Sequence, residues 1–195
     1  MKKLIIIVLL LLPVILSAQR FKGGILIGMN VSQIDGDNFP GYNKAGLVGG
    51  AFVFTEFKDK WGAQMEIRYA AKGSAAPKYY SYTRKYRLQY IEVPLLAHFE
   101  PVNKLKIQFG LSFGYLFSAA QSDGGGYEKF EEIPSRGEIA VSAGINYSLT
   151  KHLDINARFS YSVLPVFSNY TGSTWGTGAW YNNVLTFAFY YRIGQ

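Results

Sequence analysis

The sequence contains no cysteine among its 195 residues, and this absence excludes several kinds of site. Without cysteine there are no disulfide bonds, no thiolate metal ligands and no attachment point for a lipoprotein anchor. Histidine is nearly absent too, since the chain has only 2. His98 and His152 are far apart in the sequence, and neither has the spacing of a metal-binding motif. We therefore predict no metal site and no cofactor.

Long apolar runs are confined to the start of the chain. Residues 1–19, MKKLIIIVLLLLPVILSAQ, begin with two lysines, continue through an apolar stretch and end in small residues. This layout is typical of a secretory signal peptide, here cleaved after Ala18 or Gln19. An anchoring helix fits less well, because Pro13 interrupts the run and no charged stop follows. We expect residues 20–195 to form one domain without helical membrane spans.

Alternating residues replace such runs in the rest of the chain, most regularly in residues 104–117, KLKIQFGLSFGYLF. The odd positions from Leu105 to Phe117 are all bulky and apolar, and the even positions are nearly all small or polar. This pattern predicts one β-strand with two different faces. Ordinary strands have about 5–6 residues, whereas a strand that crosses a bilayer needs about 9–11. The segment is therefore long enough to span a membrane.

The size of a small barrel determines which face points outward. An eight-stranded barrel has an interior just wide enough to be filled by side chains. A bulky apolar face on every strand would not fit inside it, and the small-polar face has too few charges to be a solvated surface. We therefore expect the apolar face to contact lipid, while glycine, serine and a few charged side chains fill the lumen.

Eight segments carry this alternation. The predicted strands lie at about 21–32, 44–57, 61–72, 86–100, 104–117, 137–149 and 153–163, with the last one after residue 179. The chain is thus predicted to be all-β, an eight-stranded antiparallel up-and-down transmembrane β-barrel preceded by a cleaved signal peptide.

Loop lengths alternate as well, because the first, third, fifth and seventh connections are long and the others are a few residues. Transmembrane barrels have short periplasmic turns and long external loops. We therefore expect a protein of the outer membrane of a Gram-negative cell, with both mature termini in the periplasm and the long loops outside.

Two predicted strands are less regular. In the second, glycines blur the faces, so that either Val48, Phe52 and Phe54 or Leu47, Ala51 and Val53 could point outward, and a bulge would reconcile the two. In the fourth, Pro94 removes a hydrogen-bond donor from the ladder, and an irregularity is expected there.

Two motifs resemble a known family. The segments QMEIRYAAKG (64–73) and YIEVPLL (90–96) are similar to the third and fourth strands of the outer-membrane β-barrel family that includes PorT. The resemblance covers essentially the whole mature chain and implies a small eight-stranded barrel of the OmpX and OmpA type. It implies a function only through PorT, which is associated with a protein secretion system.

Charged residues of both signs fall on the predicted inner face. Buried charges need partners, and the lumen is narrow, so a structural ion-pair network is favoured over an ion path or a proton relay. The predicted network consists of Glu66, Arg68, Glu92, Lys106, Glu138, Arg158 and Arg192, with Lys72 and Asp154 on the same face.

The second and fourth long loops are rich in basic and aromatic residues. Contact with lipid or lipopolysaccharide phosphates, docking of an envelope or secretion protein, and an ordinary solvated loop with interfacial tyrosines all fit this composition. Nucleic acid is excluded as a partner by the location, despite the net charge of +7. The candidate binding residues are Lys78, Tyr80, Arg84, Lys85, Tyr170, Trp175 and Trp180.

No catalytic residues are predicted. His98 falls near the periplasmic end of a strand and His152 in a periplasmic turn, so neither is placed to activate a nucleophile at the outer rim. The favoured function is that of a non-enzymatic scaffold or binding protein of the envelope, with a narrow passive pore for small solutes or ions as the alternative.

Overall fold

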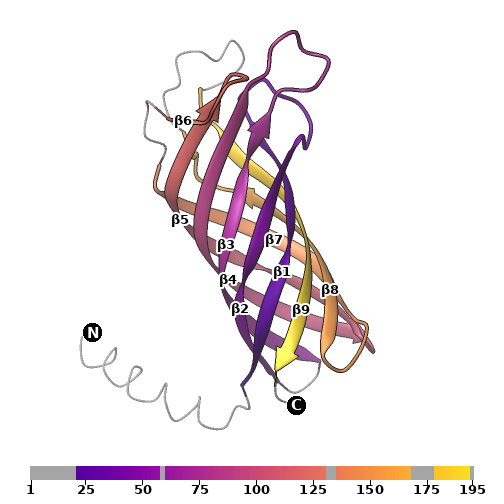
Figure 1. The fold of residues 1–195 in the computed structure, drawn as a ribbon. Coiled ribbons are helices and arrows are strands. Elements are labelled where there is room, and N and C mark those ends of the chain that lie inside the picture. The colour runs from indigo at the N-terminus through magenta and orange to yellow at the C-terminus, as the bar shows by residue number, and fades with distance from the viewer. Residues whose placement is uncertain (1–20, 58–59, 131–134, 168–177, 194–195) are drawn as a thin grey trace, which may run out of the picture.

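The computed structural model describes residues 21–57, 60–130, 135–167 and 178–193, which form a tilted antiparallel β-barrel (Figure 1). The predicted signal peptide lies outside these residues. Within them, no helix is long and apolar enough to cross a membrane. The strands are β1 (Lys22–Asp35), β2 (Lys44–Glu56), β3 (Trp61–Ala75), β4 (Lys85–Val102), β5 (Leu105–Ser122), β6 (Glu128–Lys129), β7 (Gly137–Ser148), β8 (Leu153–Ser162) and β9 (Tyr181–Ile193).

The barrel closes between strands that are neighbours in the chain. The strand order is β4-β3-β2-β1-β9-β8-β7-β5-β6, and β4 also pairs with β5. Without β6, which has 2 residues and pairs only with the end of β5, eight strands form the closed wall. Gly23 of β1 pairs with Ile193 of β9, so the wall begins and ends at the same edge of the barrel, where the connections are short. The predicted eight-stranded antiparallel barrel is confirmed.

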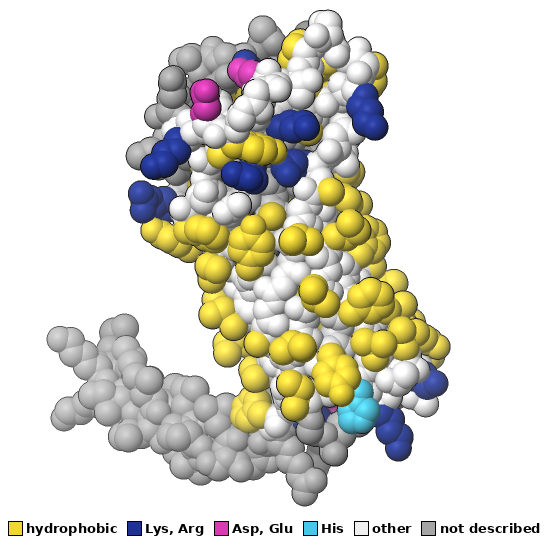
Figure 2. All heavy atoms as spheres, viewed as in Figure 1, with side chains coloured by type: hydrophobic (Ala, Val, Ile, Leu, Met, Phe, Trp, Pro, Cys, Tyr) yellow, Lys and Arg dark blue, Asp and Glu magenta, His cyan; other side chains and the backbone are white. Residues whose placement is uncertain are grey.

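The polarity of the wall follows the prediction. Phe109, Phe113 and Phe187 expose 46%, 44% and 48% of their surface, whereas Glu66 and Arg158 expose 1% and 2%. On the face that Figure 2 shows, hydrophobic side chains form a broad band across the barrel, and most Lys and Arg side chains lie beyond its edges. A hydrocarbon solvent suits such an outer surface, because it replaces water around the apolar groups.

The second strand follows one of the two registers considered. Leu47 and Val53 are exposed by 69% and 40%, whereas Val48, Phe52 and Phe54 are buried inside the barrel. The register that points Val48, Phe52 and Phe54 outward is therefore wrong. These three residues belong to an interior apolar cluster consisting of Leu26, Val48, Phe52, Phe54, Ala70, Ala188 and Tyr190. The lumen is thus more apolar than expected, and the ring of Phe52 packs edge-on against Tyr190 at 5.1 Å.

Pro94 coincides with an interrupted ladder, as predicted. Pairs between β3 and β4 run to Met65 opposite Leu95 and resume at Arg68 opposite Glu92, so the pairing skips Pro94 and its neighbour. On its other side Pro94 still pairs with Ser112 of β5. The missing amide hydrogen of proline explains why only one of the two ladders is broken.

One side of the barrel is longer than the other. Both β4 and β5 have 18 residues, against 12 in β7 and 10 in β8. The extra pairs reach from Lys85 opposite Ser122 to Gln89 opposite Ser118, beyond a register shift at the end of the alternating segment. β3, β4 and β5 therefore project at the end with the long loops (Figure 1).

Candidate functional site

The lumen is crossed by a buried ion pair between opposite walls. Arg158 on β8 donates to both carboxylate oxygens of Glu66 on β3, at 3.0 and 2.8 Å. Four steps in the strand order separate β3 from β8, which places the two side chains on facing sides of the barrel. The hydroxyl of Tyr190 donates to Glu66 Oε1 at 2.9 Å, and Gln108 Oε1 accepts from Arg158 at 3.2 Å.

A second group of charges lies beside this pair, toward the long loops. Arg68 Nε donates to Glu92 Oε2 at 2.8 Å. Lys72 forms ion pairs with both Glu92 and Glu138, and the latter contact measures 2.9 Å. Gly114 makes room for these groups, since a Cβ there would lie 3.3 Å from Glu138. All of these charged side chains are buried.

The buried charges balance. Glu66, Glu92 and Glu138 face Arg68, Lys72 and Arg158, which is three acids and three bases, and each takes part in an ion pair. We call these six residues the lumen network. Its neutral, paired arrangement offers no excess charge to attract an ion of either sign, and it fills the space through which an ion would pass.

Two of the residues predicted for the network lie elsewhere. Lys106 pairs with Glu56 at 2.8 Å, and Arg192 pairs with Asp154, both near the short turns. They are partners at the barrel mouth rather than members of the lumen network. The polar partners Gln108 and Tyr190 were not identified as site residues from the sequence. Gln108 carried a usable signal, since it stands on the inward face of the most regular strand.

The long-loop end of the lumen is closed by an apolar cluster. This outer plug consists of Ile34, Phe39, Tyr86, Leu88, Tyr90, Leu116, Val166, Phe167 and Trp180. Trp180 is 1% exposed, and its ring centroid lies 4.8 Å from that of Phe167. Backbone hydrogen bonds from Val166 to Trp180 and from Trp180 to Phe167 hold the segment in place, at 2.8 and 3.0 Å.

The predicted external binding residues separate into different environments. The prediction that Trp180 belongs to an external binding surface is wrong, because Trp180 is buried in the outer plug. It stands an even number of residues from the inward-facing Asn182 and Val184 of β9 and therefore points inward as they do.

Tyr80 is half-buried and packs edge-on against Phe39 at 6.3 Å. Arg84 donates twice to the carboxylate of Asp123, at 2.8 and 3.2 Å. Lys78 and Lys85 are exposed, and Tyr170 and Trp175 lie outside the described residues.

Lys85 belongs to a group of cations that the sequence alone did not bring together. Lys44 on β2 lies close enough to Lys85 and Arg87 on β4 for their positive charges to repel one another. The Arg87 guanidinium stacks over the ring of Tyr127, 4.0 Å from its centroid. We call Lys44, Lys85 and Arg87 the outer cation cluster. Lys44 was missed because the β2–β3–β4 register, not the sequence, brings it to Arg87.

Neither histidine lies at the outer rim. His98 is buried beside the short turns, in a cavity of about 250 Å³ that it shares with Glu56 and Lys106. His152 is exposed in the turn between β7 and β8. Among the described residues, no group of three or more His, Asp or Glu side chains is arranged to hold a metal ion.

One carboxyl group of the long-loop end has an unusual environment. Asp37, in the loop after β1, is 6% exposed and accepts a hydrogen bond from the amide of Phe39 at 2.8 Å and another from the hydroxyl of Ser74. Burial outweighs these hydrogen bonds and raises the pKa of Asp37 from 3.8 to about 6. A neutral Asp37 is therefore the form that this packing favours.

The lumen network predicts a large effect of removing one partner. We expect Arg158→Met to lower the free energy of unfolding by about 3–5 kcal/mol, because Glu66 is left buried without its main counter-charge. Urea unfolding in lipid vesicles measures it. Arg84→Met is the matched control at an exposed pair, with about 0–1 kcal/mol expected. A double variant with Glu66→Gln should recover much of the loss, and equal stability of Arg158→Met and the parent chain would contradict the network.

The buried Asp37 predicts a pH-dependent loop. Its pKa is raised in the folded state, so its contribution to stability is present below pH 3.8 and is lost as the pH rises through about 6. NMR titration of the aspartate carboxyl carbons should give Asp37 a midpoint near 6, and the loop should resist proteolysis better at about pH 5 than at about pH 7.5. Asp37→Asn should remove this pH dependence, whereas a midpoint near 4 would contradict the burial of the carboxyl.

Comparisons with known proteins agree with this geometry. Residues 17–168 match the family model described as outer membrane protein beta-barrel domain. Ail, the attachment invasion locus protein of Yersinia pestis, has 16% identity and a TM-score of 0.52, with 88% of this chain and 98% of Ail covered. Neisserial surface protein A has 13% identity and a TM-score of 0.57, with 89% and 97% covered.

A major outer membrane protein from Thermus thermophilus has 13% identity and a TM-score of 0.50, with 90% of this chain and 100% of that protein covered. At such identities the likeness shows a shared fold. No curated protein is significantly similar to this chain in sequence. The family match covers most of the chain, and its description agrees with the closed barrel and the apolar outer wall. The chain therefore belongs to the outer membrane protein β-barrel domain family, and its location is the outer membrane.

Proposed function

We propose that this chain is a non-conducting, non-enzymatic binding protein of the outer membrane, and that its binding surface is the long-loop end of β2–β5. The observation that carries the proposal is the filling of the lumen in its middle and at its long-loop end. The lumen network occupies the middle, and the outer plug closes the end above it. A protein with such an interior acts through its ends and outer surface.

The outer cation cluster supports an anionic partner. Within the described part of the chain, none of Lys44, Lys85 and Arg87 forms an ion pair, although Arg84 nearby is neutralised by Asp123. Like charges held close together raise the energy of the surface until an anion neutralises them. The cluster is thus better suited to receiving a ligand than to stabilising the fold.

The position of the outer cation cluster, just beyond the apolar band, supports a phosphate-bearing ligand. Arg87 and Lys85 continue the outward face of β4 beyond Ile91, which is 42% exposed and belongs to the apolar band. Cations just beyond the hydrocarbon meet the phosphate level of a lipid leaflet. With the short turns in the periplasm, as is usual for such barrels, this leaflet is the outer one, and lipopolysaccharide is its anionic lipid.

A protein partner fits the aromatic part of the same end. Tyr79 and Tyr82 are 77% and 55% exposed on the loop between β3 and β4, and exposed aromatic groups often contribute to protein interfaces. The resemblance to the PorT family suggests an envelope or secretion component as this partner. Ail has been solved in complex with the heparin analogue sucrose octasulfate. Its likeness to this chain is one of fold, so the same compound serves here only as a polyanionic probe.

The alternative function, a narrow passive pore, has less support. A path for ions would require the Glu66–Arg158 pair and the outer plug to move apart together. The pair makes two hydrogen bonds, at 2.8 and 3.0 Å, and the plug is an apolar core. Breaking both would leave charges unpaired and expose apolar surface, so the closed form is strongly favoured.

The outer cation cluster predicts a charge-dependent affinity. We expect the double variant Lys85→Glu and Arg87→Glu to bind lipopolysaccharide vesicles and sucrose octasulfate more than about tenfold more weakly, because two attractive charges become repulsive. Isothermal titration calorimetry of the detergent-solubilised protein measures this at low and high salt. The matched control, Lys22→Glu and Lys60→Glu, makes the same charge change beside the short turns and should leave the affinity unchanged. Equal loss in both variants would contradict the proposed surface.

A further inference from the structure

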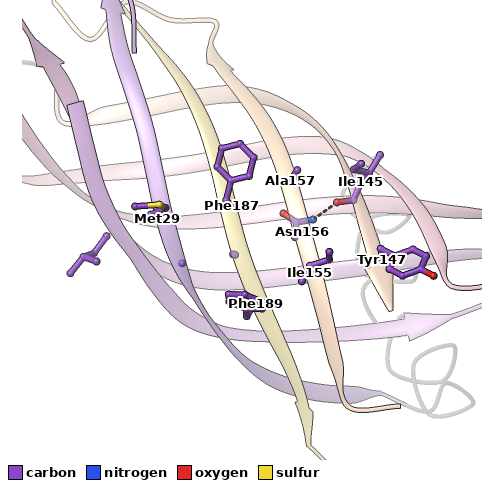
Figure 3. Close-up of a pocket in the computed structure, with 11 residues that line it drawn as sticks. Met29, Ile145, Tyr147, Ile155, Asn156, Ala157, Phe187 and Phe189 are labelled. Carbon is purple, nitrogen blue, oxygen red and sulfur yellow. Dashed lines mark hydrogen bonds between the residues drawn. The ribbon is translucent and has the colours of Figure 1, made fainter. Parts of the chain in front are cut away.

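The outer wall has an apolar groove on one side of the barrel. It has a volume of about 530 Å³ and crosses five neighbouring strands, β2, β1, β9, β8 and β7. Figure 3 shows Met29, Ile145, Tyr147, Ile155, Phe187 and Phe189 around it, with Ala157 among them. Since these side chains belong to the band that faces hydrocarbon, the groove opens toward the acyl chains of the membrane.

A small residue in a row of large ones produces the groove. Across the wall, Ala157 pairs with Ile145 on one side and with Phe187 on the other. The outward positions before and after it on β8 are Ile155 and Phe159. Larger side chains thus surround Ala157 in all four directions along the sheet, and the wall is lower at this point.

The groove leads toward the short turns and their cations. Tyr147, at the end of the groove nearest the short turns, pairs with Leu105 and Ile155. Lys104 directly precedes Leu105, and its carbonyl accepts a hydrogen bond from Ser148 at 2.8 Å. Lys151 and His152 lie in the turn that joins β7 to β8, and the His152 ring stacks on Tyr191, 6.1 Å away between centroids.

These cations are available to a ligand. Lys104 and Lys151 are exposed, and neither of them forms an ion pair with a residue that the structure describes. Acids near these lysines have other partners: Asp154 pairs with Arg192, and Glu56 pairs with Lys106. Glu100 accepts a hydrogen bond from the backbone amide of Lys104 at 3.2 Å and lies 3.9 Å from the Lys106 ammonium. Tyr147 and Tyr191 are 43% and 50% exposed, in the position of an interfacial aromatic belt.

We propose that this groove and the adjoining turns bind one anionic glycerophospholipid of the leaflet that contacts the short turns. An acyl chain lies in the groove over Ala157, and the phosphate is held by Lys104 and Lys151 at the level of the tyrosine hydroxyls. The apolar groove holds the acyl chain and the two lysines attract the phosphate, so the site favours an anionic lipid. A zwitterionic lipid would gain less from the two lysines. The site is independent of the outer cation cluster, which lies at the opposite end of the barrel.

Native mass spectrometry of the full protein, released from nanodiscs of equal phosphatidylglycerol and phosphatidylcholine with added lipopolysaccharide, tests the site. We expect the parent chain to retain phosphatidylglycerol selectively. Ala157→Phe should lose the bound lipid because the new ring fills the groove. Ala51→Phe, an outward alanine of β2 outside the groove, is the matched control and should keep it. Lys104→Gln and Lys151→Gln should each reduce the preference for phosphatidylglycerol by about fivefold.

Several results would overturn the proposal. These are retention of both phospholipids equally, retention of lipopolysaccharide in their place, unchanged lipid in Ala157→Phe, or a dimer that Ala157→Phe dissociates. Circular dichroism of each variant establishes that the barrel is folded. Lys85→Glu with Arg87→Glu should retain the phospholipid, so that failure at this groove is distinguishable from failure at the outer cation cluster.

Discussion

The bidentate contact between Arg158 and Glu66 is the interaction on which the rest of the structure depends. Hydrocarbon outside the wall forces charged side chains to the inside, and a barrel of eight strands leaves too little room there for them to be hydrated separately. Each charge must then find a partner across the lumen. Arg158 and Glu66 meet this requirement from opposite strands, and Tyr190 and Gln108 add further hydrogen bonds to the pair.

Sealing of the lumen moves any function to the ends and the outer wall. At the long-loop end, β4 and β5 extend the sheet beyond the apolar band and carry Lys85 and Arg87 clear of the hydrocarbon. At the other end, the short turns place Lys104 and Lys151 below a depression in the wall. Both sets of cations lack acidic partners among the described residues, in contrast to the fully paired charges inside. The same barrel thus combines a neutral interior with two surfaces suited to anions.

The sequence predicts the topology well because two simple constraints repeat along it. Alternation in residues 104–117 shows which side chains of that strand share a face. Alternating loop lengths show which connections lie at the same end of the barrel, and hence how successive strands run. The second strand was ambiguous for a physical reason. Glycines at 46, 49 and 50 remove the side chains that would mark a face, and interior packing of Phe52 on Tyr190 decides the register instead.

Contacts between residues that are far apart in the chain could not be predicted from the sequence. Nothing local indicates that Arg158 meets Glu66, 92 residues away, or that Lys44 lies near Arg87. Trp180 was predicted to be an external binding residue because it is aromatic and lies next to a long loop. Its position just before β9, in step with the inward-facing residues of that strand, places its side chain in the outer plug instead. Likewise, Ala157 is an ordinary outward residue in the alternation. Only its large neighbours on β7 and β9 make it the floor of a groove, and pairing across strands determines those neighbours.

Single-channel recording of the purified protein in planar bilayers tests the sealed lumen most directly. A barrel whose charges are paired across the interior, beneath an apolar plug, should give no steady conductance steps at moderate voltage and salt. Steady and reproducible steps of one size would contradict this account, because they would require a continuous water-filled path past Glu66 and Arg158.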